Sequence, residues 1–575
     1  MSTSSASPPP PTPGTKASTA QLRILTLNVW GLKYISKLRF ERIRQIALRL
    51  HSPSTPTYDF VCLQEIWYES VDWRQLQALL SSRYPHTKFF LSGAFGSGLA
   101  ILSRWPILET RTHPYSLNGL PIHVQQGDWF VGKACGAITV HHPELGLVDV
   151  WNTHFVAAGG EDGPESRRAH RITQAYELAT NARNSAKRNR HTIVCGDLNS
   201  TPPALCLRLL RDVGGLFDSW ADSRPGADPF ATELPPSATG SGARSGRTAI
   251  DPERALVDLG VTCDSPLNSW TAGKKLDARA QRGAGKRLDY ILYRGPEVVE
   301  PSNDVHPSSV PAAASTLAYE ASESTRGRLQ CTASRVVFTE PSPALEGISL
   351  SDHFGVESIL DILPPPPAAS SSSAKHTHKH GVAPSSSDVA ITTSRAKSIQ
   401  TTLAAAMQAL AGGHAGSRRT QRSHFGVFAA ALGVAVTSVV ASIFQPLSGV
   451  NPLLVLLGVV AGWAGTTMLY SAVVWFEWEK RTLRTVLEMM ELEMDQTRRL
   501  ALLPSRTPSS SSIRPIGGGG GGGGGSGSGG GDGIAERTPP SQEQGGSSSG
   551  PRAGSSSHSS GAASPLPHVR EGNLI

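Results

Sequence analysis

The sequence predicts a layered α/β domain, followed by two apolar helices long enough to cross a membrane. Between residues 21 and 362, short apolar runs rich in β-branched residues alternate with stretches whose apolar positions have helical spacing. Residues 425–444 and 452–476 contain no Asp, Glu, Lys or Arg. Each of these runs can span a hydrocarbon layer of about 30 Å.

Composition limits the function classes. The 575 residues carry a formal net charge of +8, but the Lys and Arg residues form no dense run, so we expect no nucleic-acid partner. The six cysteines have no CxxC spacing and mostly lie in apolar runs, which is typical of reduced core residues. Residues 1–20 contain no apolar core of a signal peptide and are expected to form a disordered leader.

The elements of the α/β domain alternate along residues 21–362. Strands are expected at 21–30, 59–65, 96–104, 129–140, 145–155 and 193–195, then at 290–293, 335–338 and just after His353. Helices are expected at 39–50, 73–80 and 166–183. Residues 223–256 and 296–326 are rich in Pro, Gly, Ser and Ala and are interpreted as surface insertions.

The remainder of the chain is organised around the two apolar runs. Residues 363–423 are polar and predict a tether with a short helix at 398–411, whereas 477–503 predict an amphipathic helix and 504–575 a disordered tail. Arginines precede the first run and Lys480, Arg481 and Arg484 follow the second, so the positive-inside rule predicts that both ends face the cytosol. Helices buried in a soluble core are the alternative interpretation.

Polar side chains stand where the predicted strands end. Taken singly, each has an ordinary structural interpretation: a turn or cap for Asp197 and Asn199, a salt bridge for Glu65, and a packed histidine for His154. Residues two apart in a strand point to the same side, so these pairs project together. Repetition over many strands instead favours one site, whose hard oxygen ligands suit Mg²⁺. The set is Asn28, Glu65, Asn152, His154, Asp197, Asn199, Asp289, Asp352 and His353.

The motifs that contain these residues resemble a known family. The strings LNVWG, LQEIW, LSRWPI, NTHF, GDLNSTP, KRLDYI and SDHFGV resemble the endonuclease/exonuclease/phosphatase superfamily, which has the DNase I fold. With two spans after the domain, the chain is similar to neutral sphingomyelinases and inositol phosphosphingolipid phospholipases C. The resemblance implies a four-layered α/β sandwich and Mg²⁺-dependent hydrolysis of a sphingolipid phosphodiester to ceramide and a phosphorylated headgroup.

The resemblance also implies roles for single residues. Glu65 matches the metal-ligating glutamate, with Asn28 and Asp352 beside it, and Asp197 and Asn199 match the pair that positions phosphate and water. His353 matches the general base and Asp289 its orienting carboxylate. His154 matches a histidine, expected to be charged, that stabilises the phosphorus centre or the leaving oxygen. Asn152 is expected to contact phosphate, and Lys286 and Arg287 to contact phosphate or anionic lipid, with solvated loop charges as the alternative. GAGKRLD departs from a P-loop because Arg287 stands where Ser or Thr is required.

Other functions stay open at this point. A phosphoinositide phosphatase or a nuclease of the same superfamily, or a silent lipid-binding membrane tether, would share part of the pattern. The sequence leaves open the headgroup, the organelle (endoplasmic reticulum or mitochondrial outer membrane), an anionic phospholipid activator and the oligomeric state.

Overall fold

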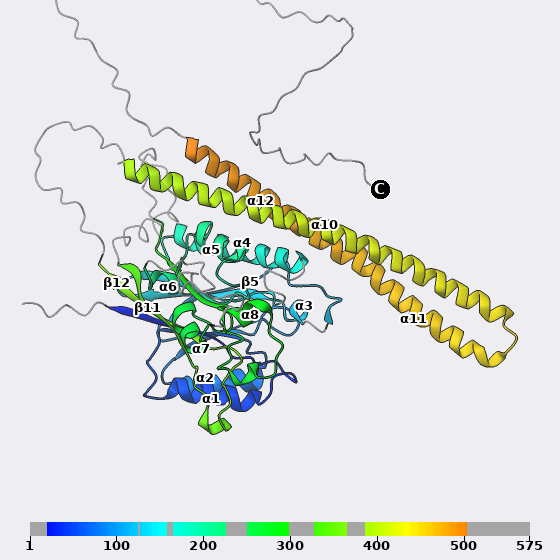
Figure 1. Ribbon diagram of the computed structural model, residues 1–575, viewed down its shortest axis with the longest axis horizontal. Helices are drawn as coiled ribbons and strands as arrows, with labels where there is room; N and C mark the ends of the chain where they lie inside the picture. The colour runs from blue at the N-terminus through cyan, green and yellow to red at the C-terminus, as the bar shows by residue number, and fades with distance from the viewer. Residues whose placement is uncertain are drawn as a thin grey trace, which may run out of the picture. The chain divides into compact units, whose positions relative to one another are not determined.

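Two six-stranded sheets form the centre of the fold (Figure 1). The computed structural model describes residues 20–124, 127–157, 165–225, 250–297, 327–364 and 386–502. The expected tail, nearly all of the leader, most of both insertions and the first part of the tether lie outside the described residues.

The first sheet has the strand order β11-β12-β1-β2-β4-β3. β1 lies parallel to β2 and antiparallel to β12. The carboxyl ends of β1 and β2 and the amino end of β12 therefore meet at one edge. The strands are β1 (Gln21–Asn28), β2 (Phe60–Gln64), β3 (His86–Phe90), β4 (Leu99–Ser103), β11 (Arg328–Val337) and β12 (Gly355–Leu363).

The second sheet repeats this arrangement in the order β5-β6-β7-β8-β10-β9. β7 lies parallel to β8, and β10 lies antiparallel to β8. The strands are β5 (Ile107–Pro114), β6 (Ala134–His142), β7 (Gly146–His154), β8 (His191–Asp197), β9 (Phe217–Asp218) and β10 (Asp289–Arg294).

Helices cover the outer face of each sheet, which confirms the four-layered sandwich. Successive strand residues point to opposite faces, so Ile24 packs between the sheets with Ile138 and Ile193, whereas Leu25 packs outward. Leu25 meets α1 (Arg39–His51) and α2 (Arg74–Leu80), and the outer face of the second sheet meets α4 (Glu165–Lys187) and α5 (Leu205–Asp212). Figure 1 shows these two helical layers on opposite sides of the sheets.

Short helices complete the domain: α3 (Asp128–Val131), α6 (Ser219–Asp222), α7 (Pro252–Arg254) and α8 (Ala278–Arg282). Three strands, β3, β5 and the two-residue β9, were not expected from the sequence. All three are edge strands, and the residues of β3 and β5 are polar and partly exposed, so they lack the apolar run or alternation that marks a buried strand. The expected strand at 129–140 begins only at Ala134, because α3 occupies the preceding residues.

The apolar runs lie in two long helical stretches. α10 (Ser386–Phe444) precedes α11 (Asn451–Tyr470), and a π-helical turn, Ser471–Trp475, joins α11 to α12 (Phe476–Leu502). Two stretches, Ser394–Phe444 and Ser448–Arg499, are long and apolar enough to cross a membrane. Only 6% and 11% of their most apolar windows are buried, unlike the core helices of a soluble domain.

Residues 386–423 differ from the expected tether with a short helix, because they are continuous with the first apolar run in α10. Leu403, Ala406 and Leu410 lie on one side of this helix and join the hydrophobic core of α4 and α5. Leu483, Val486 and Met490 of α12 join the same core. We call residues 394–423 of α10 and 476–499 of α12 the stalk. Long-range packing, which composition does not reveal, decides the structure of the stalk.

Buried polar contacts also join the stalk to the α/β domain. His170 Nδ1 accepts a hydrogen bond of 2.9 Å from the Gly119 amide, so its Nε2 carries the proton and donates to Glu479 Oε1 at 2.8 Å. Both side chains are 1% exposed. Glu493 of α12 accepts hydrogen bonds from Tyr176 and Arg183 of α4.

We expect Glu479→Ala to destabilise the chain, because it leaves the buried Nε2–H of His170 without an acceptor. The loss should be about 1–3 kcal/mol in the free energy of unfolding. The measurement is denaturant unfolding of the detergent-solubilised chain, followed by tryptophan fluorescence. The control, Glu488→Ala, removes an exposed pair with Arg484 on the same helix and should cost at most about 1 kcal/mol. Equal losses would contradict the buried contact.

Candidate active site

Six polar residues from both sheets meet where the strands converge. Asn28 ends β1 and Glu65 follows β2, whereas His154 and Asp197 end the parallel strands β7 and β8. Asp289 opens β10 directly opposite Asp197, and His353 precedes the first residue of β12. Because β10 and β12 run antiparallel to their neighbours, their amino ends reach the same edge.

The Asn28 side chain bridges the two sheets. Its Nδ2 donates to Glu65 Oε1 at 2.9 Å and to Asp197 Oδ2 at 3.1 Å. Its Oδ1 accepts from the Trp30 amide at 3.0 Å, which fixes the orientation of the side-chain amide. Asn28 thus donates to two carboxylates that stand 132 positions apart in the chain.

The backbone is constrained beside these contacts. Glu65 and Asn199 have φ values of 61° and 46°, a region that non-glycine residues seldom adopt and that is enriched at functional sites. Gly31 donates its amide to Glu65 O at 3.0 Å, and a Cβ at Gly31 would lie 2.2 Å from that oxygen. The glycine of the LNVWG string is therefore needed for this close approach.

His353 lies between two carboxylates. Its Nδ1 is 2.8 Å from Asp289 Oδ2, and its Nε2 is 3.9 Å from Asp197 Oδ2. Each of Asp197, Asp289 and His353 offers one ligand atom within 4.8 Å of the other two, a spacing that could hold a metal ion. With Asn28 as the link to Glu65, these five residues form one site rather than separate neighbourhoods.

Burial shifts the pKa values of the acids in this site. Burial and, secondarily, Asp352 raise the pKa of Glu65, and burial likewise raises that of Asp352. Burial and the adjacent Asp289 raise the pKa of Asp197 to about 7. Burial lowers the pKa of His353, but the opposite effects of Cys263 and Asp289 together are larger. The pKa of His353 therefore lies well above the usual value. The site therefore favours additional positive charge.

Lys133 is a site residue that the sequence analysis missed. Its side chain is 3% exposed. Its Nζ lies 2.9 Å from His154 Nε2 and 3.6 Å from Asp128 Oδ1. Burial, Lys133 and His353 lower the pKa of His154 well below the usual value, which favours its neutral form over the charged form that the sequence analysis expects. Lys133 supplies the cation at this position. A single lysine within the apolar run 129–140 was the available signal.

Asn199, Asn152 and Asp352 surround this centre in different ways. The Asn199 amide donates to Asp197 Oδ1 at 2.8 Å, and its side chain donates to Phe155 O. Asn152 is fully buried and donates to Leu63 O and Ala100 O, which ties β7 to the first sheet. Asp352 lies 3.9 Å from Lys274 and keeps its Oδ1 without a hydrogen-bond partner among the described residues.

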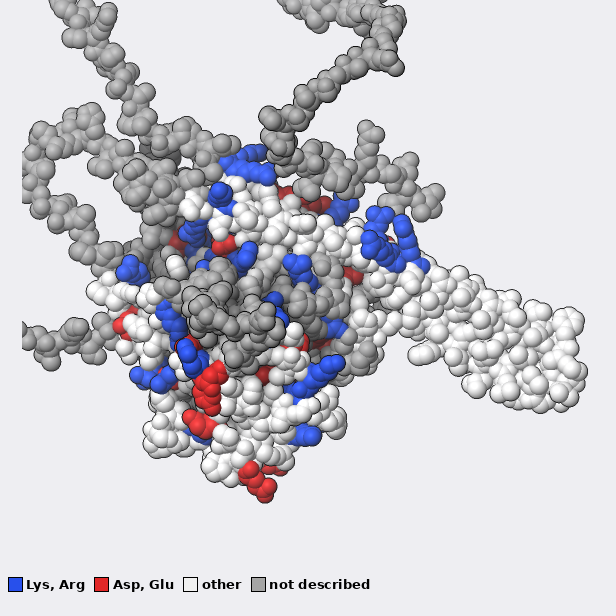
Figure 2. Space-filling model, in the orientation of Figure 1, with Lys and Arg blue, Asp and Glu red and all other residues white. Residues whose placement is uncertain are grey.

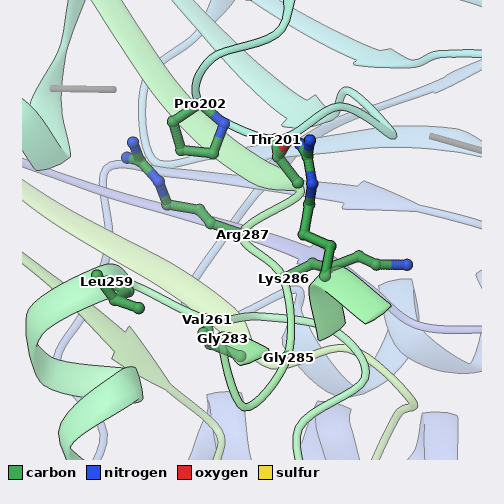
Figure 3. Close-up of a pocket in the computed structure, with 9 residues that line it drawn as sticks. Thr201, Pro202, Leu259, Val261, Gly283, Gly285, Lys286 and Arg287 are labelled. Carbon is green, nitrogen blue, oxygen red and sulfur yellow. Dashed lines mark hydrogen bonds between the residues drawn. The ribbon is translucent and has the colours of Figure 1, made fainter. Parts of the chain in front are cut away.

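Lys286 and Arg287 line a separate pocket beside the GDLNSTP string. Figure 3 shows Thr201 and Pro202 facing them across this pocket. Lys286 pairs with Asp264 at 3.2 Å and with Asp277 at 2.5 Å, and Arg287 pairs with the buried Asp218 at 3.0 Å. The structure therefore places both cations next to acids of their own and does not join them to the Asn28–Asp197 contacts.

Arg42 is a second buried residue that the sequence analysis did not select. Its guanidinium donates to Val29 O, Trp30 O and Leu350 O, so it joins the loop after β1 to the segment before His353. Burial lowers the pKa of Arg42 to about 10, against the opposing effect of nearby Asp352 and Glu65. Arginines within a helix usually face solvent, so nothing in the sequence indicated that Arg42 is buried.

The donor set suits a hard divalent cation. Glu65 Oε2, Asp289 Oδ1 and Asp352 Oδ1 are buried and have no hydrogen-bond partner among the described residues. Buried carboxylate oxygens are costly without a proton, a donor or a cation. All are oxygen atoms, which Mg²⁺ and similar ions prefer. The residues thus form a candidate metal site, whose ion the donor set alone does not identify.

Comparison with known proteins agrees with this arrangement. Residues 25–353 match the Endonuclease/Exonuclease/phosphatase family. The chain is 31% identical over 345 residues to inositol phosphosphingolipids phospholipase C of Schizosaccharomyces pombe, an alignment that covers 60% of this chain and 69% of the relative. It is 38% identical over 274 residues to sphingomyelin phosphodiesterase 2 of Homo sapiens, covering 48% of this chain and 56% of the relative.

Among solved structures, the crystal structure of SmcL matches with a TM-score of 0.36 and 17% sequence identity, covering 59% of this chain and 99% of that chain. The sequence matches determine the family. The chain belongs to the Endonuclease/Exonuclease/phosphatase family and, within it, to the group of phosphoric diester hydrolases that contains the inositol phosphosphingolipid phospholipases C and the neutral sphingomyelinases.

Proposed function

We propose that this protein is a membrane-anchored, Mg²⁺-dependent phospholipase C that hydrolyses sphingomyelin or inositol phosphosphingolipids to ceramide and a phosphorylated headgroup. The observation that carries the proposal is the convergence of Glu65, Asp197 and His353 through the Asn28 bridge. The names of the relatives support a sphingolipid substrate.

His353 is the proposed general base. The hydrogen bond between Nδ1 and Asp289 fixes the ring, so that Nε2 faces the Asp197 carboxylate. The pKa of His353 is raised by the surrounding acids and thiol, and the positive charge of a bound cation would lower it and favour the neutral base. In the proposed reaction, the neutral Nε2 takes a proton from water while the water oxygen bonds to phosphorus and the bond from phosphorus to the ceramide oxygen breaks. The ceramide alkoxide then takes up a proton from solvent. Asp289 stabilises the imidazolium that results.

The other side of the site is the proposed phosphate-binding side. The Lys133 ammonium would bring positive charge toward the position where negative charge develops on the phosphate oxygens. His154, which lies 3.5 Å from Asp197 Oδ2 and contacts Lys133, keeps this lysine in place. Asn199 holds Asp197 through its backbone amide.

Glu65, Asn28, Asp197 and Asp289 would hold the cation, with Asp352 and His353 close by. When bound, Mg²⁺ supplies positive charge that polarises a phosphate oxygen and assists the departure of the ceramide oxygen. The unpartnered carboxylate oxygens support this assignment.

The two apolar helical stretches support membrane anchoring. Figure 2 shows a projecting surface without Lys, Arg, Asp or Glu, with a group of blue residues at its base. In the sequence, Arg418, Arg419 and Arg422 precede the first run and Lys480 and Arg481 follow the second. We propose that both ends, and thus the α/β domain, face the cytosol. Anionic phospholipid would be attracted to these charges and is the proposed activator.

We expect purified protein to release labelled headgroup from sphingolipid vesicles in the presence of Mg²⁺ and to lose this activity in EDTA. The assay compares sphingomyelin, an inositol phosphosphingolipid, a phosphoinositide and duplex DNA, each with and without anionic phospholipid. Preferred cleavage of the phosphoinositide or the DNA would replace our proposal with the corresponding phosphatase or nuclease. Absence of all four activities would favour a silent lipid-binding tether.

His353→Ala should lower kcat by about 10²–10⁴-fold, because the proposed base is removed. The control is His51→Ala, which changes an exposed histidine at the end of α1. Both variants are assayed on the preferred substrate of the wild type. Activity of His353→Ala within about twofold of His51→Ala would contradict the assignment of the base.

Glu65→Gln should weaken Mg²⁺ binding, because a carboxylate ligand becomes a neutral amide. Ligand binding raises the melting temperature with ligand concentration, so the gain on adding Mg²⁺ after EDTA treatment reports affinity without requiring activity. The wild type and the exposed-site control Glu144→Gln should show the same gain. An undiminished gain in Glu65→Gln would exclude Glu65 as a ligand.

A further inference from the structure

Four large apolar side chains lie exposed in two adjacent segments of the α/β domain, the loop 91–98 and the residues in and just before α3. Leu91, Phe95, Val124 and Trp129 are 66%, 66%, 65% and 39% exposed, and we call these four residues the rim. A group of apolar side chains in water is costly for a folded domain and commonly marks a contact surface.

Backbone contacts join the two segments that carry the rim. The amides of Ala94 and Phe95 donate to Phe130 O at 3.0 and 3.1 Å, and the Phe95 and Phe130 rings are 6.0 Å apart. Gly93 and Gly132 touch through their backbones, since a Cβ at either would lie within 2.6 Å of the other glycine. These contacts fix the positions of the two segments of the rim relative to each other.

The rim adjoins the end of the second apolar run. The Trp129 and Trp475 rings are 6.3 Å apart, and Trp478 Nε1 donates to Ser116 O at 3.3 Å. Trp475 is the next-to-last residue of that run, and Lys480 and Arg481 follow it. Tryptophans followed by cations are typical of the depth at which a helix leaves the bilayer.

We propose that the rim is a second bilayer contact, in which these side chains enter the interfacial region of the membrane beside the hairpin. The inference rests on the proposed anchoring of the chain. A lipid surface is favoured over a protein partner because the rim is continuous, through Trp129 and Trp475, with the helices that would cross the bilayer.

The contact would bring the active site to the headgroup layer. Gly132, which is held against Gly93, directly precedes Lys133, and Lys133 Nζ lies 2.9 Å from His154 Nε2. A phosphodiester at the bilayer surface could then reach the site without leaving the membrane. The rim thus links the position of the bilayer to the residues proposed to bind phosphate.

The test uses the full chain in phosphatidylcholine vesicles, with and without bromine on the acyl chains. An environment-sensitive thiol dye is attached to one introduced cysteine at a time: Phe95→Cys or Leu91→Cys in the rim, Trp463→Cys in α11, or Val257→Cys. Val257 is 65% exposed and lies outside the rim. Five native cysteines are buried, and dye-treated wild type gives the background from Cys263.

We expect dye emission at residues 91 and 95 to shift to shorter wavelength on vesicles and to be quenched by brominated lipid, as at residue 463, with neither effect at 257. Quenching at 463 with rim emission equal to that at 257 would overturn the rim contact and leave the anchoring intact. Emission at 463 that stays water-like would refute the anchoring itself, and with it this inference. Circular dichroism of each variant confirms folding, and two rim positions guard against one failed variant.

Discussion

The structure depends on the hydrogen bonds that the Asn28 amide donates to two buried carboxylates. These bonds join Glu65 of the first sheet to Asp197 of the second, at 2.9 and 3.1 Å. Without them, two acids with raised pKa values would face each other across the interface between the sheets. The four layers are held by apolar packing, but the side chains of Asn28 and Asn152 set how the polar ends of the two sheets align.

Basic residues around the Asn28 side chain partly balance the charge of the nearby acids. Lys133 and His353 bring basic groups to the acids, and Arg42 holds the loops that follow β1 and precede β12. Three carboxylate oxygens still lack a hydrogen-bond partner among the described residues. Positive charge from a bound cation would complete the balance, which is why a metal site and a phosphate site are expected at the same place.

Through the stalk, α10 and α12 contribute side chains to the hydrophobic core of the α/β domain. Leu403 and Leu483 complete the core on α4 and α5, and Glu479 accepts a hydrogen bond from His170. Gly119, whose amide donates to His170, lies against the side chain of Asp128, which pairs with Lys133. A chain of direct contacts therefore joins the proposed membrane anchor to the candidate site, so an anchored enzyme would have both position and orientation set by the same helices.

The sequence by itself determined the α/β class, the principal strands, the two apolar runs and most of the polar residues of the site. It did so because strand ends carry local signals: an apolar run, a break, then an acid, amide or histidine. Edge strands β3 and β5 were missed because their residues are partly exposed and lack that pattern. The helix at 386–423 replaced an expected tether because its stability comes from contacts with α4 and α5.

Only the tertiary structure decided which polar residues meet. It brought Lys133 next to His154, which lowers the pKa of His154, and it paired Arg287 with Asp218. It also buried Arg42, which donates hydrogen bonds to two separate loops. Charge pairing and burial depend on residues far apart in the chain, and a single side chain's type does not reveal them. The sequence specifies the chemical groups, whereas packing of the two sheets sets their distances and protonation.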